Sequence, residues 1–306
     1  MSQADSNDNV APAPPPGPSP CPYLDPQNAP LPKSGWLRRW PGVTYLLPFI
    51  TFMLVGYFEP KPPDPKVLAD MARYEDQRKN GNAAQKHVAE QELAKLKEEE
   101  AHSIPYKYYP GIYTAKIALT TLAMLAVVPG YLAFPLRLNG IAWIVGSVGA
   151  VGWILLSKLQ VSLYPHLPEM LSSALEMGGR SGFNPLVELK DNPTWAWTFL
   201  AIRFFGLVVV VAVIEEFFLR GFLMRYVMDI DWHLIPFGVV NRLALITVLV
   251  FPVIYHPERL AAAFWFSLVT WMMLRTRNIW DCVVAHGVTN LLMGLWVVYS
   301  GDWWMM

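Results

Sequence analysis

The chain has 306 residues, of which 54% are hydrophobic and 16% are charged, and its formal net charge is +0. Soluble domains contain roughly 45–50% apolar and about 25% charged residues, so this composition excludes an ordinary soluble domain. The balanced charge gives no basis for nucleic-acid binding. Cys21 and Cys282, the two cysteines, provide neither a disulfide framework nor the spacing of a zinc knuckle.

The chain begins with a polar, proline-rich segment that lacks the apolar core of a signal peptide. Such runs of proline favour an extended chain, so we predict a disordered tail over residues 1–40. Residues 41–306 are predicted to form a membrane-embedded helical domain. A hydrophilic insertion at residues 59–110 interrupts this domain. Its Glu- and Lys-rich part, residues 67–101, is predicted to be a solvated helix with a break at Asn80-Gly81-Asn82.

Seven apolar segments after the tail are predicted to cross a membrane as helices, a role that needs about 20 residues each. They cover residues 43–58, 112–134, 140–156, 195–225, 239–255, 260–274 and 279–299. An eighth span could lie in residues 161–189 or 226–238. The predicted fold is therefore all-α, a polytopic membrane helical bundle of about seven to eight transmembrane helices.

Positively charged residues predict the orientation of this bundle. If the segments alternate in direction, the Lys and Arg residues in the short loops and at the segment ends fall on one side. They are Lys33, Arg38, Arg39, Arg137, Arg220, Arg225, Arg275 and Arg277. Cytoplasmic loops carry an excess of Lys and Arg, so we place the N-terminus in the cytoplasm. We expect an integral protein of the cytoplasmic (inner) membrane.

Two adjacent carboxylates, Glu215 and Glu216, stand within the apolar segment 195–225. An ionised side chain at membrane depth costs roughly 2.5 to over 10 kcal/mol, and such residues commonly have a function. Glu216 and Arg220 lie four residues apart on one helix face, where they can form an ion pair. Glu215 points roughly 100° away from Glu216 and so lies off the helix face that carries Arg220. A carboxylate outside that ion pair can accept a proton, so we interpret Glu215 as a general base. The sequence assigns no partner to Arg203 in the same segment.

Two histidines and an asparagine stand in later apolar segments. His256 ends the fifth segment, and His286 and Asn290 share one face of the seventh at a spacing of four residues. Histidine and asparagine side chains can donate hydrogen bonds to a developing oxyanion. Taken singly, Glu216 with Arg220 could be a structural ion pair, and the later residues could form hydrogen bonds between helices. Their joint occurrence on three segments favours a site.

These residues resemble the CAAX protease and bacteriocin-processing (CPBP, or Abi) family of glutamate-type intramembrane endopeptidases. The motifs of that family are Glu-Glu-x-x-x-Arg, Phe-x-x-x-His and His-x-x-x-Asn/Asp. Glu215, Glu216 and Arg220 match the first motif, and His286 and Asn290 match the third.

Of the second motif, Phe-x-x-x-His, only the histidine is matched, by His256. Pro252 stands four residues before it, and Phe251 stands one residue further away. The resemblance covers roughly residues 43–306. The runs Phe-Phe-Leu-Arg-Gly-Phe-Leu-Met-Arg-Tyr and Tyr-His-Pro-Glu look like the exosortase-associated branch of bacterial CAAX-protease-like proteins.

The resemblance implies peptide hydrolysis without a covalent intermediate, near a membrane-associated segment such as a C-terminal one. Glu215, helped by His256, would activate a water, while His286 and Asn290 would stabilise the tetrahedral oxyanion. Glu216 and Arg220 would hold the site in shape or position the substrate. The expected partners are the lipid bilayer and a membrane-anchored protein or peptide, with no nucleic acid and no cofactor.

Two alternatives stay open at this point. Glu215, His256 and His286 could instead be the three protein ligands of a catalytic zinc ion, although the sequence has no His-Glu-x-x-His. The protein could also be a transporter or a non-catalytic membrane scaffold, because intramembrane Glu, Arg and His mark ion pathways as well. The diacid segment has no internal repeat, which argues against a transporter.

Overall fold

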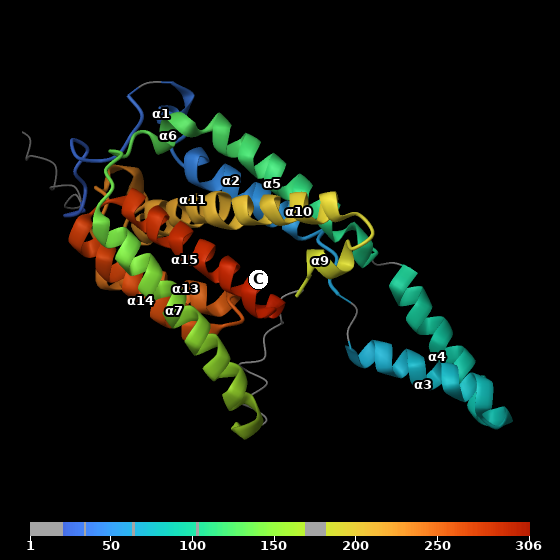
Figure 1. Ribbon diagram of the computed structural model, residues 1–306. Helices are drawn as coiled ribbons and strands as arrows, with labels where there is room; N and C mark the ends of the chain where they lie inside the picture. The colour runs from blue at the N-terminus through green and yellow to red at the C-terminus, as the bar shows by residue number, and fades with distance from the viewer. Residues whose placement is uncertain (1–20, 34, 63–64, 102–103, 169–181) are drawn as a thin grey trace, which may run out of the picture.

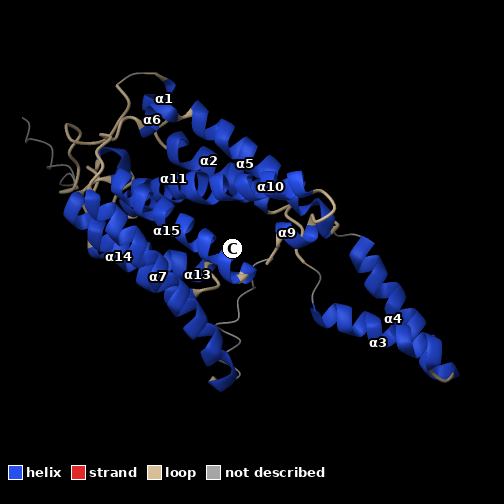
Figure 2. Ribbon diagram, viewed as in Figure 1, coloured by secondary structure: helices blue, strands red, loops and turns tan. Residues whose placement is uncertain are grey.

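The structure is a computed structural model that describes residues 21–33, 35–62, 65–101, 104–168 and 182–306. All regular secondary structure in these residues is helical (Figures 1 and 2). The proline-rich tail stays a prediction for residues 1–20, which lie outside the described residues. Residues 21–40 contain turns and the short helix α1 (Trp36–Arg39), and the Asp25 N–H donates to the Leu234 carbonyl at 2.9 Å.

The diacid lies in a helical stretch of 34 residues, Pro193–Tyr226. It passes through five consecutive parts: α10 (Pro193–Phe205), a π-helix (Gly206–Val211), α11 (Ala212–Glu216), a second π-helix (Phe217–Leu223) and α12 (Met224–Tyr226). It begins where a helix is expected to begin, because the Asn192 side chain accepts from the Trp195 N–H at 3.1 Å. The two π-helices flank the carboxylates, and such interruptions are frequent at functional sites.

Three helices pack side by side below this stretch in Figure 1: α7 (Gly140–Leu163), α14 (Arg259–Thr276) and α15 (Ile279–Ser300). Glycines of α7 permit the close approach. A Cβ added at Gly146 would lie 2.7 Å from the Ala285 carbonyl oxygen, and one at Gly149 would lie 2.9 Å from the Trp265 ring. Small residues of this kind allow helix backbones to approach each other in membranes.

The remaining helices complete the bundle and its hydrophilic extension. They are α2 (Val43–Gly56), α3 (Pro65–Asn80), α4 (Ala83–Ala101), α5 (Tyr109–Ala126), α6 (Val128–Tyr131), α9 (Pro185–Glu188) and α13 (Arg242–Tyr255). Helices α2 and α5 cover the face of the diacid helix opposite α15 (Figure 1). Helices α3 and α4 form a hairpin that extends away from the bundle, and its break falls at Gly81 and Asn82 as the sequence predicts.

Length and composition make three of the described helices able to cross a membrane: α7, Pro193–Tyr226 and α15. Helices α2 and α13 are apolar but have 14 residues each. Each of the seven predicted segments contains a helix, but the segment 112–134 is divided between α5 and α6, which ends at Tyr131. The count of seven to eight spans stays a prediction. Residues 226–238, where an eighth span was one option, contain a 3-10 turn at Trp232–Leu234, and residues 169–181 lie outside the described part of the chain.

The outer surface of the bundle is apolar. Leu54, Leu122 and Leu155, on α2, α5 and α7, are 61%, 62% and 62% exposed. Large contiguous apolar surfaces are uncommon on soluble monomers and are typical of contact with lipid. Together with the long apolar helices, this surface indicates a membrane protein.

Candidate active site

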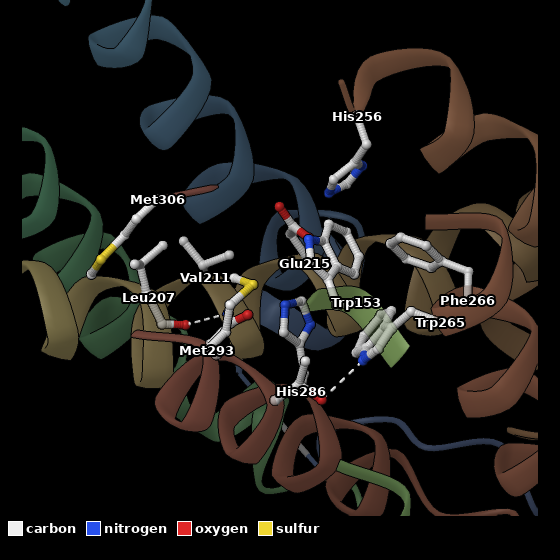
Figure 3. Close-up of a pocket in the computed structure, with 12 residues that line it drawn as sticks. Trp153, Leu207, Val211, Glu215, His256, Trp265, Phe266, His286, Met293 and Met306 are labelled. Carbon is white, nitrogen blue, oxygen red and sulfur yellow. Dashed lines mark hydrogen bonds between the residues drawn. The ribbon is translucent and has the colours of Figure 1, made fainter. Parts of the chain in front are cut away.

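One cavity brings together the four side chains that the sequence predicts to be catalytic. Glu215, His256, His286 and Asn290 all line it, from α11, the end of α13 and α15 (Figure 3). Its volume is about 70 Å³. Since a water molecule needs roughly 10–15 Å³ of such space, the cavity is large enough for several waters. The structure therefore assembles these residues around a space in which a water and a peptide carbonyl group could meet.

The two adjacent carboxylates have different environments. Glu215 is half-buried and lines the cavity, whereas Glu216 is fully buried and is not part of the lining. One Glu216 oxygen, Oε2, accepts a hydrogen bond from Arg220 Nη1, so the predicted i, i+4 ion pair is present. The other oxygen, Oε1, lies 3.0 Å from His286 Nδ1. Both oxygens of Glu216 thus have polar partners, which a buried charge requires.

Glu216 fixes the orientation of the His286 ring. A carboxylate can only accept, so Nδ1 carries a proton in the bond to Glu216. The opposite ring nitrogen, Nε2, then points away from Glu216 and accepts or donates according to the protonation of the ring. The Trp265 ring packs edge-on against His286 at a centroid distance of 4.6 Å. His286 is therefore held on two sides, with its remaining nitrogen available to the cavity.

His256 is held by the backbone at the end of α13. Its Nδ1 lies 2.9 Å from the carbonyl oxygen of Pro252, and its own N–H donates to the same oxygen at 3.1 Å. A carbonyl oxygen only accepts, so Nδ1 is the protonated nitrogen and Nε2 is an acceptor in the neutral ring. The contact uses the backbone of residue 252 and not its side chain. The departure of Pro252 from the family's Phe-x-x-x-His motif therefore leaves this hydrogen bond intact.

A residue of α7 supports the loop that follows His256. Gln160 Nε2 donates to the Pro257 carbonyl at 2.8 Å, and the Leu260 N–H donates to Gln160 Oε1 at 3.0 Å. The first bond joins α7 to the connection between α13 and α14, and the second joins α7 to the first turn of α14. They fix the backbone next to His256, and nothing in the sequence motifs identifies Gln160 in advance.

Asn290 contacts the first π-helix. Its Nδ2 donates to the Leu207 carbonyl oxygen at 2.8 Å. One of its two amide protons is thereby used inside the fold, and its second N–H and its side-chain oxygen remain to face the cavity. The bond ties α15 to the diacid helix eight residues before Glu215.

One comparison with known proteins, the scan against family models, gives a match. The family model for type II CAAX prenyl endopeptidase Rce1-like proteins matches residues 195–292. This Rce1-like segment is 98 of the 306 residues, and it contains the diacid helix from Trp195 onward, His256, His286 and Asn290. The match shows similarity to this endopeptidase family over that segment, and it does not distinguish the exosortase-associated branch. Neither the comparison with curated proteins nor the comparison with solved structures gives a match.

Part of the cavity wall lies outside the Rce1-like segment. Trp153 comes from α7, and Met306 comes from the last turn of the chain (Figure 3). Within the segment, Trp265 Nε1 donates to Thr289 Oγ1 at 2.9 Å. Sequence motifs do not identify these residues, because tryptophan and methionine are common in any apolar helix. Only the packing of α7 against α14 and α15 brings Trp153 to the site.

Arg203 has a structural contact away from the cavity. Its guanidinium is buried and donates to the Phe183 carbonyl oxygen at 2.8 Å. The sequence assigned no partner to this arginine, and a backbone carbonyl far along the chain could not be found from helical spacing. Arg203 is therefore not one of the residues around the cavity.

The zinc alternative finds little support in the arrangement of side chains. Glu215, His256 and His286 line one cavity, but no three His, Cys, Asp or Glu side chains of the described residues converge as metal ligands would. The residues present do not fit a zinc ion, and we derive no step through one.

Proposed function

We propose that this protein is an intramembrane endopeptidase that hydrolyses a peptide bond near the membrane-associated end of an anchored protein or peptide. The observation that carries the proposal is the cavity, in which Glu215, His256, His286 and Asn290 meet on an Rce1-like segment. Polar groups converging in an otherwise apolar pocket are the usual mark of an active site.

The proposed reaction begins with a water between Glu215 and His256. Nε2 of His256 accepts one hydrogen bond from the water, and the Glu215 carboxylate removes a proton as the oxygen adds to the carbonyl carbon. The carbon–oxygen double bond becomes a tetrahedral oxyanion. Glu215 then returns its proton to the nitrogen as the carbon–nitrogen bond breaks, which leaves a carboxylic acid and an amine. No covalent bond to the protein forms.

The second histidine and the asparagine act on the oxyanion. Nε2 of His286 can donate to it when the ring is protonated, and the second amide proton of Asn290 can do so at any pH. Glu216 and Arg220 are positioning residues in this scheme, because Glu216 holds the orientation of His286 and Arg220 compensates its charge.

The substrate class follows from two resemblances. The family description names a CAAX prenyl endopeptidase, which makes a peptide with a prenylated cysteine and three further residues the first probe. The exosortase-associated resemblance makes an unprenylated C-terminal sorting tail the second. We also propose the cytoplasmic (inner) membrane as the location, with the N-terminus in the cytoplasm and with no metal cofactor.

The test uses the full chain, purified and returned to lipid vesicles, with fluorogenic peptides of both classes. Wild type is expected to cleave at least one class and to retain activity in a metal chelator. Glu215→Gln should lower turnover by roughly 10³-fold or more, since it removes the base and leaves the shape. Glu188→Gln, an exposed carboxylate on α9, is the matched control and should act like wild type.

Several outcomes would contradict the proposal. Cleavage by Glu215→Gln at the rate of wild type would remove the hydrolytic role of Glu215. Loss of activity in chelator, restored by zinc, would favour a metallohydrolase. A folded protein that cleaves neither class while moving ions across the vesicle membrane would favour a transporter.

A further inference from the structure

One hydrogen-bond donor in the cavity has no role in the scheme so far. Trp153 is 5% exposed and lines the cavity, and its indole Nε1–H has no acceptor among the residues that the structure describes. An indole N–H donates and cannot accept. Most buried donors in folded proteins have a partner, so a buried exception that faces a cavity needs an explanation.

The position of Trp153 is fixed by its surroundings. It stands one turn after Gly149, where α7 approaches α14 and α15 closely. Its ring lies 5.5 Å from the His256 ring, with a nearly perpendicular, edge-on geometry, and 6.4 Å from Trp265. Figure 3 shows the indole in the same part of the cavity as Glu215 and His256. The donor is therefore held close to the reacting groups.

The neighbouring tryptophan provides a contrast on the same wall. Trp265 also lines the cavity, but its N–H is bound to Thr289, which in turn donates to a backbone carbonyl. Its ring supports His286 and its polar atom is used inside the fold. The Trp153 ring likewise contacts a histidine, His256, but its Nε1–H has no acceptor among the described residues.

The proposed oxyanion has one pH-independent donor so far, the second amide proton of Asn290. Asn290 uses one amide proton on Leu207, and His286 uses Nδ1 on Glu216. The other nitrogen of His286 donates only when the ring is protonated. An indole N–H keeps its proton at every working pH, so Trp153 can supply a constant donor.

We propose that the Trp153 N–H donates a hydrogen bond to the carbonyl oxygen of the scissile peptide bond. The bond strengthens as water adds to the carbonyl carbon and the pair of electrons moves to that oxygen, and it weakens when the carbon–nitrogen bond breaks. No proton leaves the indole at any stage. The inference rests on the proposed hydrolytic function and adds to it a catalytic residue from outside the Rce1-like segment.

The first test is Trp153→Phe in the vesicle assay, with the peptide that wild type cleaves best. Removal of one oxyanion donor lowers kcat by roughly 10² to 10³-fold in well-studied cases, and we expect a loss near the lower end with little change in KM. Trp143→Phe is the matched control, because Trp143 lies on the same helix and is exposed on its outer face. It should keep the kcat of wild type.

A second variant separates the hydrogen bond from packing. Benzothienylalanine incorporated at position 153 keeps the size and shape of the indole and replaces N–H by sulfur. It should lower kcat as Trp153→Phe does while the unfolding temperature stays that of wild type. Wild-type kcat in this variant would overturn the proposal, even if Trp153→Phe fails to fold.

A third measurement tests which group receives the bond. A thioamide at the scissile position weakens acceptance at that atom, so wild type should lose more rate on the thioamide peptide than Trp153→Phe does. Equal losses in the two proteins would show that Trp153 acts on another group and would overturn the proposal.

Binding keeps this inference distinct from the proposed function. A peptide ketone of the same sequence should bind Glu215→Gln more tightly than it binds the Glu215→Gln, Trp153→Phe double variant. Equal binding overturns the role of Trp153, whatever the turnover. The remaining outcome is that Trp153→Phe weakens ketone binding while wild type cleaves no peptide. That result would contradict the proposed function and would still support the Trp153 contact.

Discussion

Two ion pairs have a buried cation in an apolar helix, and their surroundings differ. Glu216 and Arg220 have fully buried side chains, and the pair continues through His286 to the cavity. Lys116 of α5 pairs with Glu59 at 2.5 Å, with side chains 6% and 21% exposed, and its ammonium lies over the Phe52 ring at 4.2 Å. A charge at membrane depth therefore does not by itself identify a site. The polar side chains that converge beside it do.

Loss of the guanidinium from the first pair should have the largest effect. Arg220→Met leaves the buried Glu216 carboxylate without its guanidinium partner, although still in contact with His286, which costs about 3–5 kcal/mol of folding free energy. Glu216 would no longer be held on the Arg220 side, and the orientation of His286 depends on Glu216, so turnover per folded molecule should fall by roughly 10²-fold or more. Thermal unfolding and kcat, measured in the same vesicles, check both effects. A stable and fully active Arg220→Met would contradict the positioning role.

The same change in the second pair should affect stability alone. Lys116→Met removes the ammonium from Glu59, but Glu59 is partly exposed, so we expect a loss of about 2 kcal/mol. The kcat of the molecules that remain folded should stay within about twofold of wild type, because neither residue lines the cavity. If kcat falls as it does in Arg220→Met, the comparison between the two pairs fails.

Restoring the family motif should change little. Pro252→Phe creates Phe-x-x-x-His while keeping the carbonyl oxygen that binds the N–H and ring of His256. We expect kcat to stay within about threefold of wild type, since the backbone oxygen that holds His256 is unchanged. Steady-state kinetics check this. A large change in kcat in either direction would mean that the side chain at position 252 positions His256.

The smallest effect should come from an ion pair at the end of the chain. Lys158 binds Asp302 at 2.8 Å, and this hydrogen bond lowers the pKa of the Asp302 carboxyl below its usual value. A lowered pKa gives stability above the usual pKa of an aspartate, and that stability is lost as the pH falls through the lowered value. The pair is partly exposed to solvent, so Asp302→Asn should cost less than about 1 kcal/mol at neutral pH. The difference from wild type should vanish in strong acid, as unfolding measured against pH can show.

The sequence predicts much of the fold because apolar length and helical spacing are local properties. Each of the seven apolar segments contains a helix, and the Glu216–Arg220 pair follows from four residues on one face. The contact between Glu216 and His286 joins residues 70 positions apart, so no local pattern contains it. The bond from Asn290 to Leu207 likewise depends on how α15 meets a π-helix. Trp153 reaches the cavity only through the packing of α7.

The central claim is that Glu215 is the base and Glu216 is a positioning residue. Comparing Glu215→Gln with Glu216→Gln tests it most directly. Turnover and unfolding temperature are measured for both in the same vesicles. We predict that Glu215→Gln loses turnover at an unchanged unfolding temperature, whereas Glu216→Gln loses both, because it breaks a buried network. A Glu215→Gln protein that cleaves as wild type does, or one that loses turnover only by unfolding, would contradict the assignment of Glu215 as the base.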